Sequence, residues 1–100
     1  MKGLKFDSGK PMFSLIPPLS EREVAKVLTY GASKYAPDNW KLVDNATNRY
    51  ISAARRHINS AMVGDQYDDE TGLHHYAHAI CCLMFMMEVE LEKRREEERA

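Results

Sequence analysis

The stretch that decides the fold is DDETGLHHYAHAICCLMFMMEVEL, residues 68–91. Apolar side chains recur in it at alternating steps of four and three residues, which is the spacing of one face of a helix. This first stripe consists of Leu73, Ala77, Ile80, Met84, Met87 and Leu91. A second stripe, Cys82, Phe85 and Val89, lies on nearly the opposite side of the same helix. A helix that is apolar on two faces must be buried on two faces, so this helix is predicted to be the centre of the protein.

The rest of the chain offers too few helices to cover both faces of this central helix. We therefore expect self-association, as a homo-oligomer (dimer or tetramer) formed through residues 73–91. The alternative is a tightly packed monomeric bundle.

Two shorter helices are predicted upstream of residue 68. Ser20 and Glu23 fit a capping box that opens the first, which ends near Tyr35 ahead of Pro37. The second is expected to run from about Ala46 to Val63 and to stop at Gly64. The fold class is all-α, a small bundle of three main helices in a single domain, residues 1–100.

The flanks of this bundle have their own character. Residues 1–18 are predicted to form an irregular arm, because turn residues and Pro17-Pro18 interrupt any helix there. Phe6 and Phe13 suggest that the arm packs on the body. The central helix is expected to begin at Asp69 or Thr71 as N-cap and to end in a charged helical tail, residues 92–100.

Composition excludes several classes of protein. The net charge of −1 provides no basic field for a nucleic-acid polymer or an anionic membrane, although it leaves room for a nucleotide. The apolar run from Ala79 to Met87 is too short to cross a bilayer. Cys81 and Cys82 are adjacent and poorly placed to bridge, so reduced core thiols and a soluble, cytoplasmic protein without a signal peptide are predicted.

Histidines and carboxylates gather at the start of the central helix. His75 and His78 project from one side of it, while Asp68 and Glu70 stand just upstream. His57 lies on the neighbouring helix and is brought near them by an antiparallel pairing. This donor set suits a divalent metal, with Mg or Mn preferred and Co, Fe or Zn also possible. The alternative is that these histidines are structural core residues.

Cations and flat side chains form a second group, which suits phosphates and a base. Its members are Lys34, Tyr35, Asn39, Trp40 and Arg56. A surface lysine and a core tryptophan would give the same pattern, so this signal is weaker than the histidine cluster.

Several motifs together resemble a known family. They are KFDSGKP, EVAKVLTYGASKY with the GA-x-KY-x(3)-NW pattern, and D-x-E-x-G-x-x-H-x-x-H-A, and they span about residues 5–90. The chain is similar to phage and prophage proteins described as dATP/dGTP diphosphohydrolases, related to all-α MazG-type nucleoside triphosphate pyrophosphohydrolases. The resemblance implies metal-dependent hydrolysis of a purine deoxynucleoside triphosphate to a monophosphate and pyrophosphate, and assembly as dimers or tetramers. The E-x-x-E and E-x-x-D pairs of the MazG relatives are not recognisable here.

Roles follow for the residues already named. His57, Asp68, Glu70, His75 and His78 would hold the metal, and Glu70 would orient or deprotonate the attacking water. Lys34 and Arg56 would counter phosphate charge, while the base or sugar would be held by Tyr35, Asn39 and Trp40. Lys10 on the arm would close over the site. Two rival hypotheses remain: a non-catalytic protein that sequesters a nucleotide, and a helical interaction module.

Overall fold

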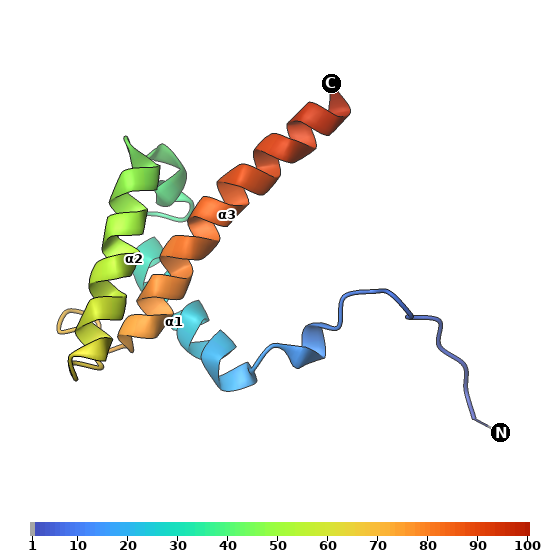
Figure 1. Ribbon diagram of the computed structural model, residues 1–100, viewed down its shortest axis with the longest axis horizontal. Helices are drawn as coiled ribbons and strands as arrows, with labels where there is room; N and C mark the ends of the chain where they lie inside the picture. Colours follow the sequence, from blue (N-terminus) through green and yellow to red (C-terminus); the bar gives the residue numbers. More distant parts are fainter. Residues whose placement is uncertain (1) are drawn as a thin grey trace.

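The computed structural model describes residues 2–100 of the chain. Three α-helices dominate it (Figure 1): α1 (Pro18–Lys34), α2 (Ala46–Met62) and α3 (His75–Arg99). Two short 3₁₀ turns, η1 (Phe13–Leu15) and η2 (Asn39–Leu42), lie before and after α1. The predicted fold class, an all-α bundle of three main helices, is confirmed.

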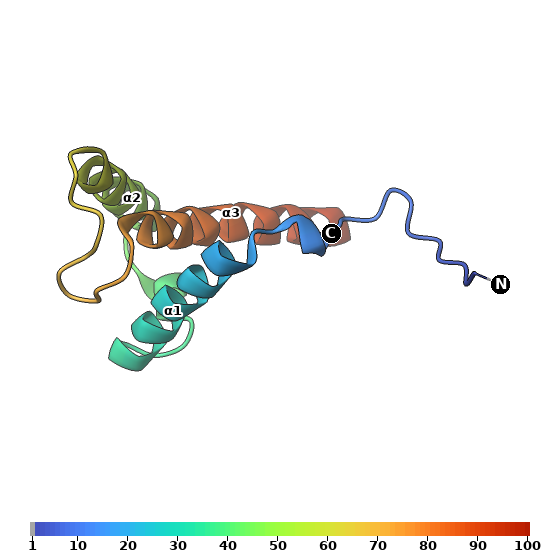
Figure 2. The ribbon, with the colours of Figure 1, turned by 90° about the horizontal axis from the view of Figure 1, so that it is seen from below.

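Helix α3 is the centre of the arrangement, with α1 and α2 packed on different sides of it (Figure 2). The buried apolar residues are small: Ala54, Ala77, Ala79, Cys81 and Cys82. Small side chains allow helix backbones to approach closely, and both cysteines are free thiols, as predicted. No helix within residues 2–100 is long and apolar enough to span a bilayer.

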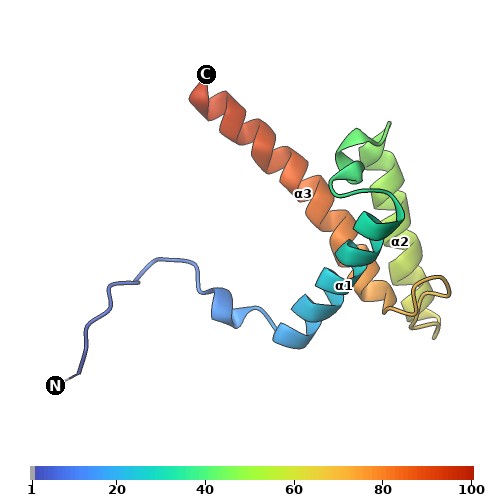
Figure 3. The same cartoon turned by 180° about the vertical axis from the view of Figure 1, so that it is seen from behind.

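The predicted apolar stripe of α3 is only partly covered within one chain. Ile80, Met84, Met87 and Leu91 are all at least 40% exposed. The C-terminal part of α3 projects past the other two helices (Figures 1 and 3). No large side chain among the described residues is fully buried. A single chain therefore leaves its central helix short of partners.

Two predicted helix starts are wrong. Helix α1 begins at Pro18, which is favoured at the first helical position because it lacks an N–H. The capping box of Ser20 and Glu23 is therefore not formed, and Glu23 instead pairs with Lys26 at 3.1 Å. Helix α3 begins at His75, later than predicted, because the side chain of its N-cap, His74, accepts a hydrogen bond from the Tyr76 N–H.

The predicted helix ends agree better with the structure. Helix α1 ends at Lys34 with Tyr35 as C-cap, and α2 ends at Met62. Gly64 follows α2 with a φ of +99°, a left-handed conformation that glycine adopts without strain.

The N-terminal arm does not pack on the body, contrary to the prediction. It runs away from the helices (Figure 1), and Phe6 and Phe13 are 82% and 77% exposed. The physical reason lies at the start of α1: Pro17 is extended, with a φ of −59° and a ψ of 118°, because it precedes another proline. This geometry directs the arm outward instead of back along α1.

Candidate metal centre and adjoining cleft

Three side chains with metal-ligating atoms converge where α2 meets α3. His57 comes from α2, His75 is the first residue of α3, and Asp68 lies in the loop between them. Each offers one ligand atom, and these atoms lie within 4.8 Å of one another. All three were predicted ligands, and the turn after Gly64 brings them together in the expected way.

The two histidines meet through their Nδ1 atoms, which are 2.8 Å apart. Only one of two nitrogens this close can carry a hydrogen, so the rings share one proton. Nitrogens ligating a single cation also stand about 3 Å apart, given metal–nitrogen bonds of about 2.1 Å. The separation of the two nitrogens is therefore compatible with both rings ligating one metal ion.

His75 carries a further sign of a metal ligand. The residue is buried, and its Nε2 atom has no hydrogen-bond partner among residues 2–100. The nearest acid, Asp65, has its Oδ2 atom 3.5 Å away. Buried polar atoms without partners are rare, and a ligating imidazole typically directs its second nitrogen at a carboxylate. The donor set thus fits a divalent cation, with Asp65 as an outer carboxylate that sequence analysis missed.

Asp68 shapes the loop that carries it. Its Oδ2 accepts hydrogen bonds from the Thr71 N–H (2.9 Å), the Thr71 hydroxyl (3.1 Å) and the Glu70 N–H (3.1 Å). Burial acts to raise the pKa of the Asp68 carboxyl, but the hydrogen bonds from Thr71 outweigh it and hold that pKa below its ordinary value. Asp68 is consequently an anion beside the histidines.

His78 connects this cluster to open space. Its ring stacks on His57 with centroids 4.6 Å apart, and its Nε2 lies 2.7 Å from the Thr71 hydroxyl. Burial lowers the pKa of both His57 and His78. The two rings are therefore held in the neutral form that binds metals.

Glu70 does not belong to the histidine–aspartate cluster. Its carboxylate accepts a hydrogen bond from the Tyr30 hydroxyl at 2.8 Å and forms an ion pair with Lys34, both on α1. The Lys34 ammonium lowers the pKa of Glu70 and has its own pKa raised in return. Glu70 thus ties the loop to α1, and Lys34 already has an anionic partner.

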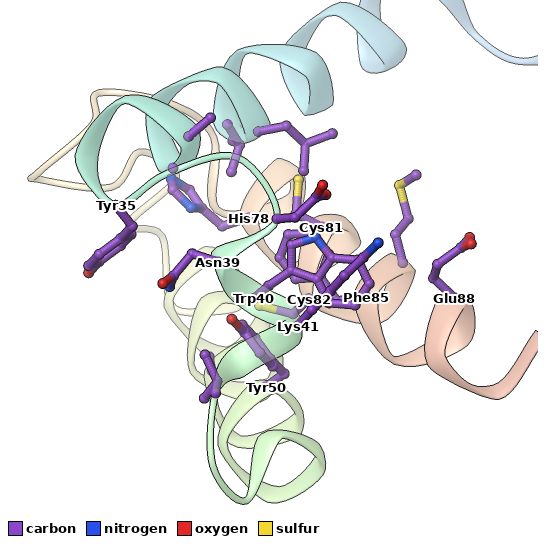
Figure 4. Close-up of a pocket in the computed structure, with 18 of the residues that line it drawn as sticks. Tyr35, Asn39, Trp40, Lys41, Tyr50, His78, Cys81, Cys82, Phe85 and Glu88 are labelled. Carbon is purple, nitrogen blue, oxygen red and sulfur yellow. The ribbon is translucent and has the colours of Figure 1, made fainter. Parts of the chain in front are cut away.

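A cleft of about 920 Å³ opens beside the cluster, between α1, η2, α2 and α3. The predicted residues Tyr35, Asn39 and Trp40 line it together with His78 (Figure 4), and so does Arg56. Lys10 does not line it: this residue belongs to a turn of the N-terminal arm, which runs away from the helices (Figure 1).

Aromatic packing shapes the cleft. Trp40 stacks flat on Phe85 with centroids 4.7 Å apart, and Tyr50 meets Phe85 edge-on at 5.3 Å. Phe85 was predicted only as a buried stripe residue, and Tyr50 was not predicted to contribute. Nothing in their spacing showed that they meet Trp40, because that contact depends on how α2, α3 and η2 pack.

This is a small helical domain in which a histidine–aspartate cluster opens, through His78, onto an aromatic cleft lined by side chains of both charges. The chain belongs to the family described as dATP/dGTP diphosphohydrolase, N-terminal, whose model matches residues 1–99. It is 45% identical over 86 residues to a protein from Salmonella phage PMBT28 named dATP/dGTP diphosphohydrolase. That match covers 86% of this chain and 29% of the relative, so the chain spans less than a third of the relative's length. No protein of known structure matches the chain. The relation to MazG-type enzymes stays a prediction.

Proposed function

We propose that this domain hydrolyses a purine deoxynucleoside triphosphate, dATP or dGTP, to the monophosphate and pyrophosphate with the help of a divalent metal. The observation that carries the proposal is the continuity of the histidine–aspartate cluster with the aromatic cleft through His78. The name of the phage relative supports the substrate class. Such an activity would act on the nucleotide pool of an infected cell.

The cluster supplies the metal site of this proposal. His57, Asp68 and His75 would hold the ion, and His78 would stand at its edge toward the cleft. When bound, a divalent ion neutralises phosphate charge and lowers the pKa of a coordinated water. Mg²⁺ and Mn²⁺ suit the carboxylate, while the histidines also admit Co²⁺, Fe²⁺ or Zn²⁺.

The cleft supplies substrate binding. Arg56 would counter phosphate charge, and Tyr35 and Asn39 would contact the base or sugar. Phe85 covers one face of Trp40 and the Lys41 ammonium lies 5.5 Å from its ring centroid, so a base would stack on the face away from Phe85. The purine would then add to an existing aromatic stack instead of creating a new one.

The reaction itself requires few groups. Water oxygen adds to the α-phosphorus, the bond from that phosphorus to the α–β bridging oxygen breaks, and pyrophosphate leaves. The proton of the water passes to a basic side chain. We assign this role to His78, which is neutral, lines the cleft and touches the cluster. Glu70, the acceptor suggested by the sequence, is engaged with Tyr30 and Lys34, so we assign it to loop positioning.

The test is product analysis by anion-exchange chromatography after incubation of this chain with each dNTP and Mg²⁺, Mn²⁺ or Co²⁺. Monophosphate and pyrophosphate support the proposal. Bound but unchanged nucleotide supports a sequestering protein, and absence of binding supports an interaction module; either result contradicts hydrolysis by this domain.

Matched substitutions locate the site. Arg56→Ala is expected to raise KM about tenfold, because a charge-assisted contact of about 1.5 kcal/mol is lost. Arg55→Ala is the control, since Arg55 neighbours it on α2 but does not line the cleft. His78→Gln should lower kcat by at least about 100-fold, whereas Glu70→Gln should retain most of it. The reverse order would return the proton-acceptor role to Glu70.

A further inference from the structure

The chain exposes far more surface than a compact protein of its mass. Its accessible area is 8,449 Å², whereas a folded monomer of 11.5 kDa exposes about 5,800 Å². Its radius of gyration is 16.9 Å, against about 13 Å for a compact domain of 100 residues. The excess of about 2,600 Å² is well above the roughly 800 Å² per partner that a standard interface covers.

Two segments contribute exposed apolar side chains to this surface. One is the arm, in which Phe6, Phe13 and Leu15 are each at least 74% exposed. The other is the α3 strip, which we define as Ile80, Leu83, Met84, Met87 and Leu91, all between 40% and 58% exposed. Both segments belong to every copy of the chain, so two copies related by a twofold axis can cover each other's strip with their arms.

The charges that line the cleft balance each other. Among the described residues, the cleft is lined by the cations Lys41, Arg49 and Arg56 and by an equal number of carboxylates, Asp38, Glu88 and Glu92. Lys34, on the neighbouring stretch of α1, is paired with Glu70. A cleft without net charge is poorly matched to a triphosphate, which carries about four negative charges, even with one divalent ion.

Lys10 of a second copy would add a positive charge to this cleft. It closes a turn in which its N–H donates to the Asp7 carbonyl (3.0 Å) and Gly9 has a φ of +80°. This turn stands between the two apolar residues Phe6 and Phe13, in an arm that runs away from the helices (Figure 1) and contributes no residue to the lining of the cleft. Met84 belongs both to the α3 strip and to the lining of the cleft, so an arm laid along the strip would pass beside the cleft there.

We propose that the chain works as an arm-exchanged dimer, in which the arm of one copy covers the α3 strip of the other and its Lys10 contacts the phosphates bound in the partner's cleft. The nucleotide contact rests on the proposed function, whereas the dimer does not. The arm–strip contact would cover apolar side chains that the single chain leaves in water.

The first test is sedimentation velocity of the full chain at micromolar concentration. The dimer mass is expected for the wild type. Replacing Phe6, Phe13 and Leu15 together by Ser should yield the monomer mass. These three side chains are exposed in the single chain, so the substitutions leave its helical core intact. A monomeric wild type, or an arm variant that stays fully dimeric, overturns the proposal.

The second test is complementation between two defective copies. Lys10→Ala keeps the cluster but lacks the arm cation, and His75→Ala keeps the arm but lacks a predicted metal ligand. When equal amounts of the two variants pair at random, half of the dimers contain one copy of each. Each of these mixed dimers has one intact site out of two, so the mixture should show about a quarter of wild-type activity. A mixture no more active than its two components overturns the transfer of Lys10. Asp68→Asn replaces His75→Ala if the latter fails to fold.

Binding provides a readout that does not depend on turnover. Titration calorimetry with the α,β-methylene analogue of dGTP should show about tenfold weaker binding to Lys10→Ala, with Lys5→Ala as the control from the other side of the turn. Equal affinities for the two variants contradict the phosphate contact. If the wild type binds this analogue and is dimeric but hydrolyses no dNTP, the proposed hydrolysis fails while the arm-exchanged dimer stands.

Discussion

Addition of a divalent metal should stabilise the folded chain, and His75 should be required for the effect. A ligand that binds only the folded state, present at 100 times its Kd, raises the free energy of unfolding by about 2.7 kcal/mol. For a domain of this length each kcal/mol moves Tm by about 4–8 °C, so Mn²⁺ should raise Tm by about 10 °C or more. The geometry behind this expectation is the pair of Nδ1 atoms 2.8 Å apart beside the Asp68 carboxylate.

The same relation gives the metal-induced stabilisation that His75→Ala should lose. Removal of one of the protein ligands is expected to weaken binding about 100-fold or more. At the same Mn²⁺ concentration the ion is then only at its Kd, and its stabilisation falls to about 0.4 kcal/mol, or roughly 2 °C. The measurement is thermal unfolding followed by circular dichroism, with and without Mn²⁺, at one fixed protein concentration.

The adjacent histidine offers the matched control. His74 caps α3 through the Tyr76 N–H but does not belong to the ligand cluster. His74→Ala should lower Tm in the absence of metal, because a cap contributes about 1 kcal/mol, yet it should keep the full metal-induced rise. The metal-site assignment is refuted if His75→Ala retains the rise, or if the wild type shows none with Mg²⁺, Mn²⁺ or Co²⁺.

Three further predictions concern the packing around the site. Phe85→Ala should lower the free energy of unfolding, measured by urea titration, by about 2–3 kcal/mol, because the ring stacked on Trp40 is lost. The fluorescence emission of Trp40 should shift to longer wavelength for the same reason. An unchanged emission spectrum would contradict the stacking. Burial raises the pKa of the Cys81 thiol to about 12. Iodoacetamide should therefore label this thiol at least about 100-fold more slowly in the native protein than in urea, as followed by mass spectrometry. Equal labelling rates would disprove its burial. Gly64→Ala should cost about 1–2 kcal/mol because φ is +99° there, whereas Gly31→Ala, inside α1 with open space around it, should not destabilise the chain.

The sequence contained enough information to predict the helices but not where two of them begin. Periodicity and the stop signals Pro37 and Gly64 located α1 and α2 to within a few residues. The predicted starts of α1 and α3 were wrong because Ser, Thr and Asp are favoured both as helix N-caps and in turns. Asp68 and Thr71 do form the hydrogen bonds typical of such residues, but they close a loop instead of opening α3.

The convergence of His57, Asp68 and His75 was predictable because it depends on local spacing and one antiparallel helix pairing. His75 and His78 are fixed by a single helix, and Gly64 returns the chain so that His57 faces them. The role of Glu70 was not predictable in this way. Its partners, Tyr30 and Lys34, lie 40 and 36 residues away along the chain, and only the packing of α1 brings them to it.

Two carboxylates of the loop before α3, Asp68 and Glu70, therefore have different roles. Asp68 faces the histidines of α2 and α3, whereas Glu70, two residues later, grips α1. Helix α1 also forms one wall of the cleft that would bind the nucleotide. The loop therefore connects this wall to the histidine–aspartate cluster that would hold the metal. A phosphate that attracts Lys34 competes with Glu70 for it and loosens this tie. Glu70→Gln should then allow the loop to move without removing a ligand: hydrogen exchange of the amides of residues 65–74 should rise, while the metal-induced increase in Tm should be kept. Loss of that increase in Glu70→Gln would instead make Glu70 a ligand, as the sequence alone suggested.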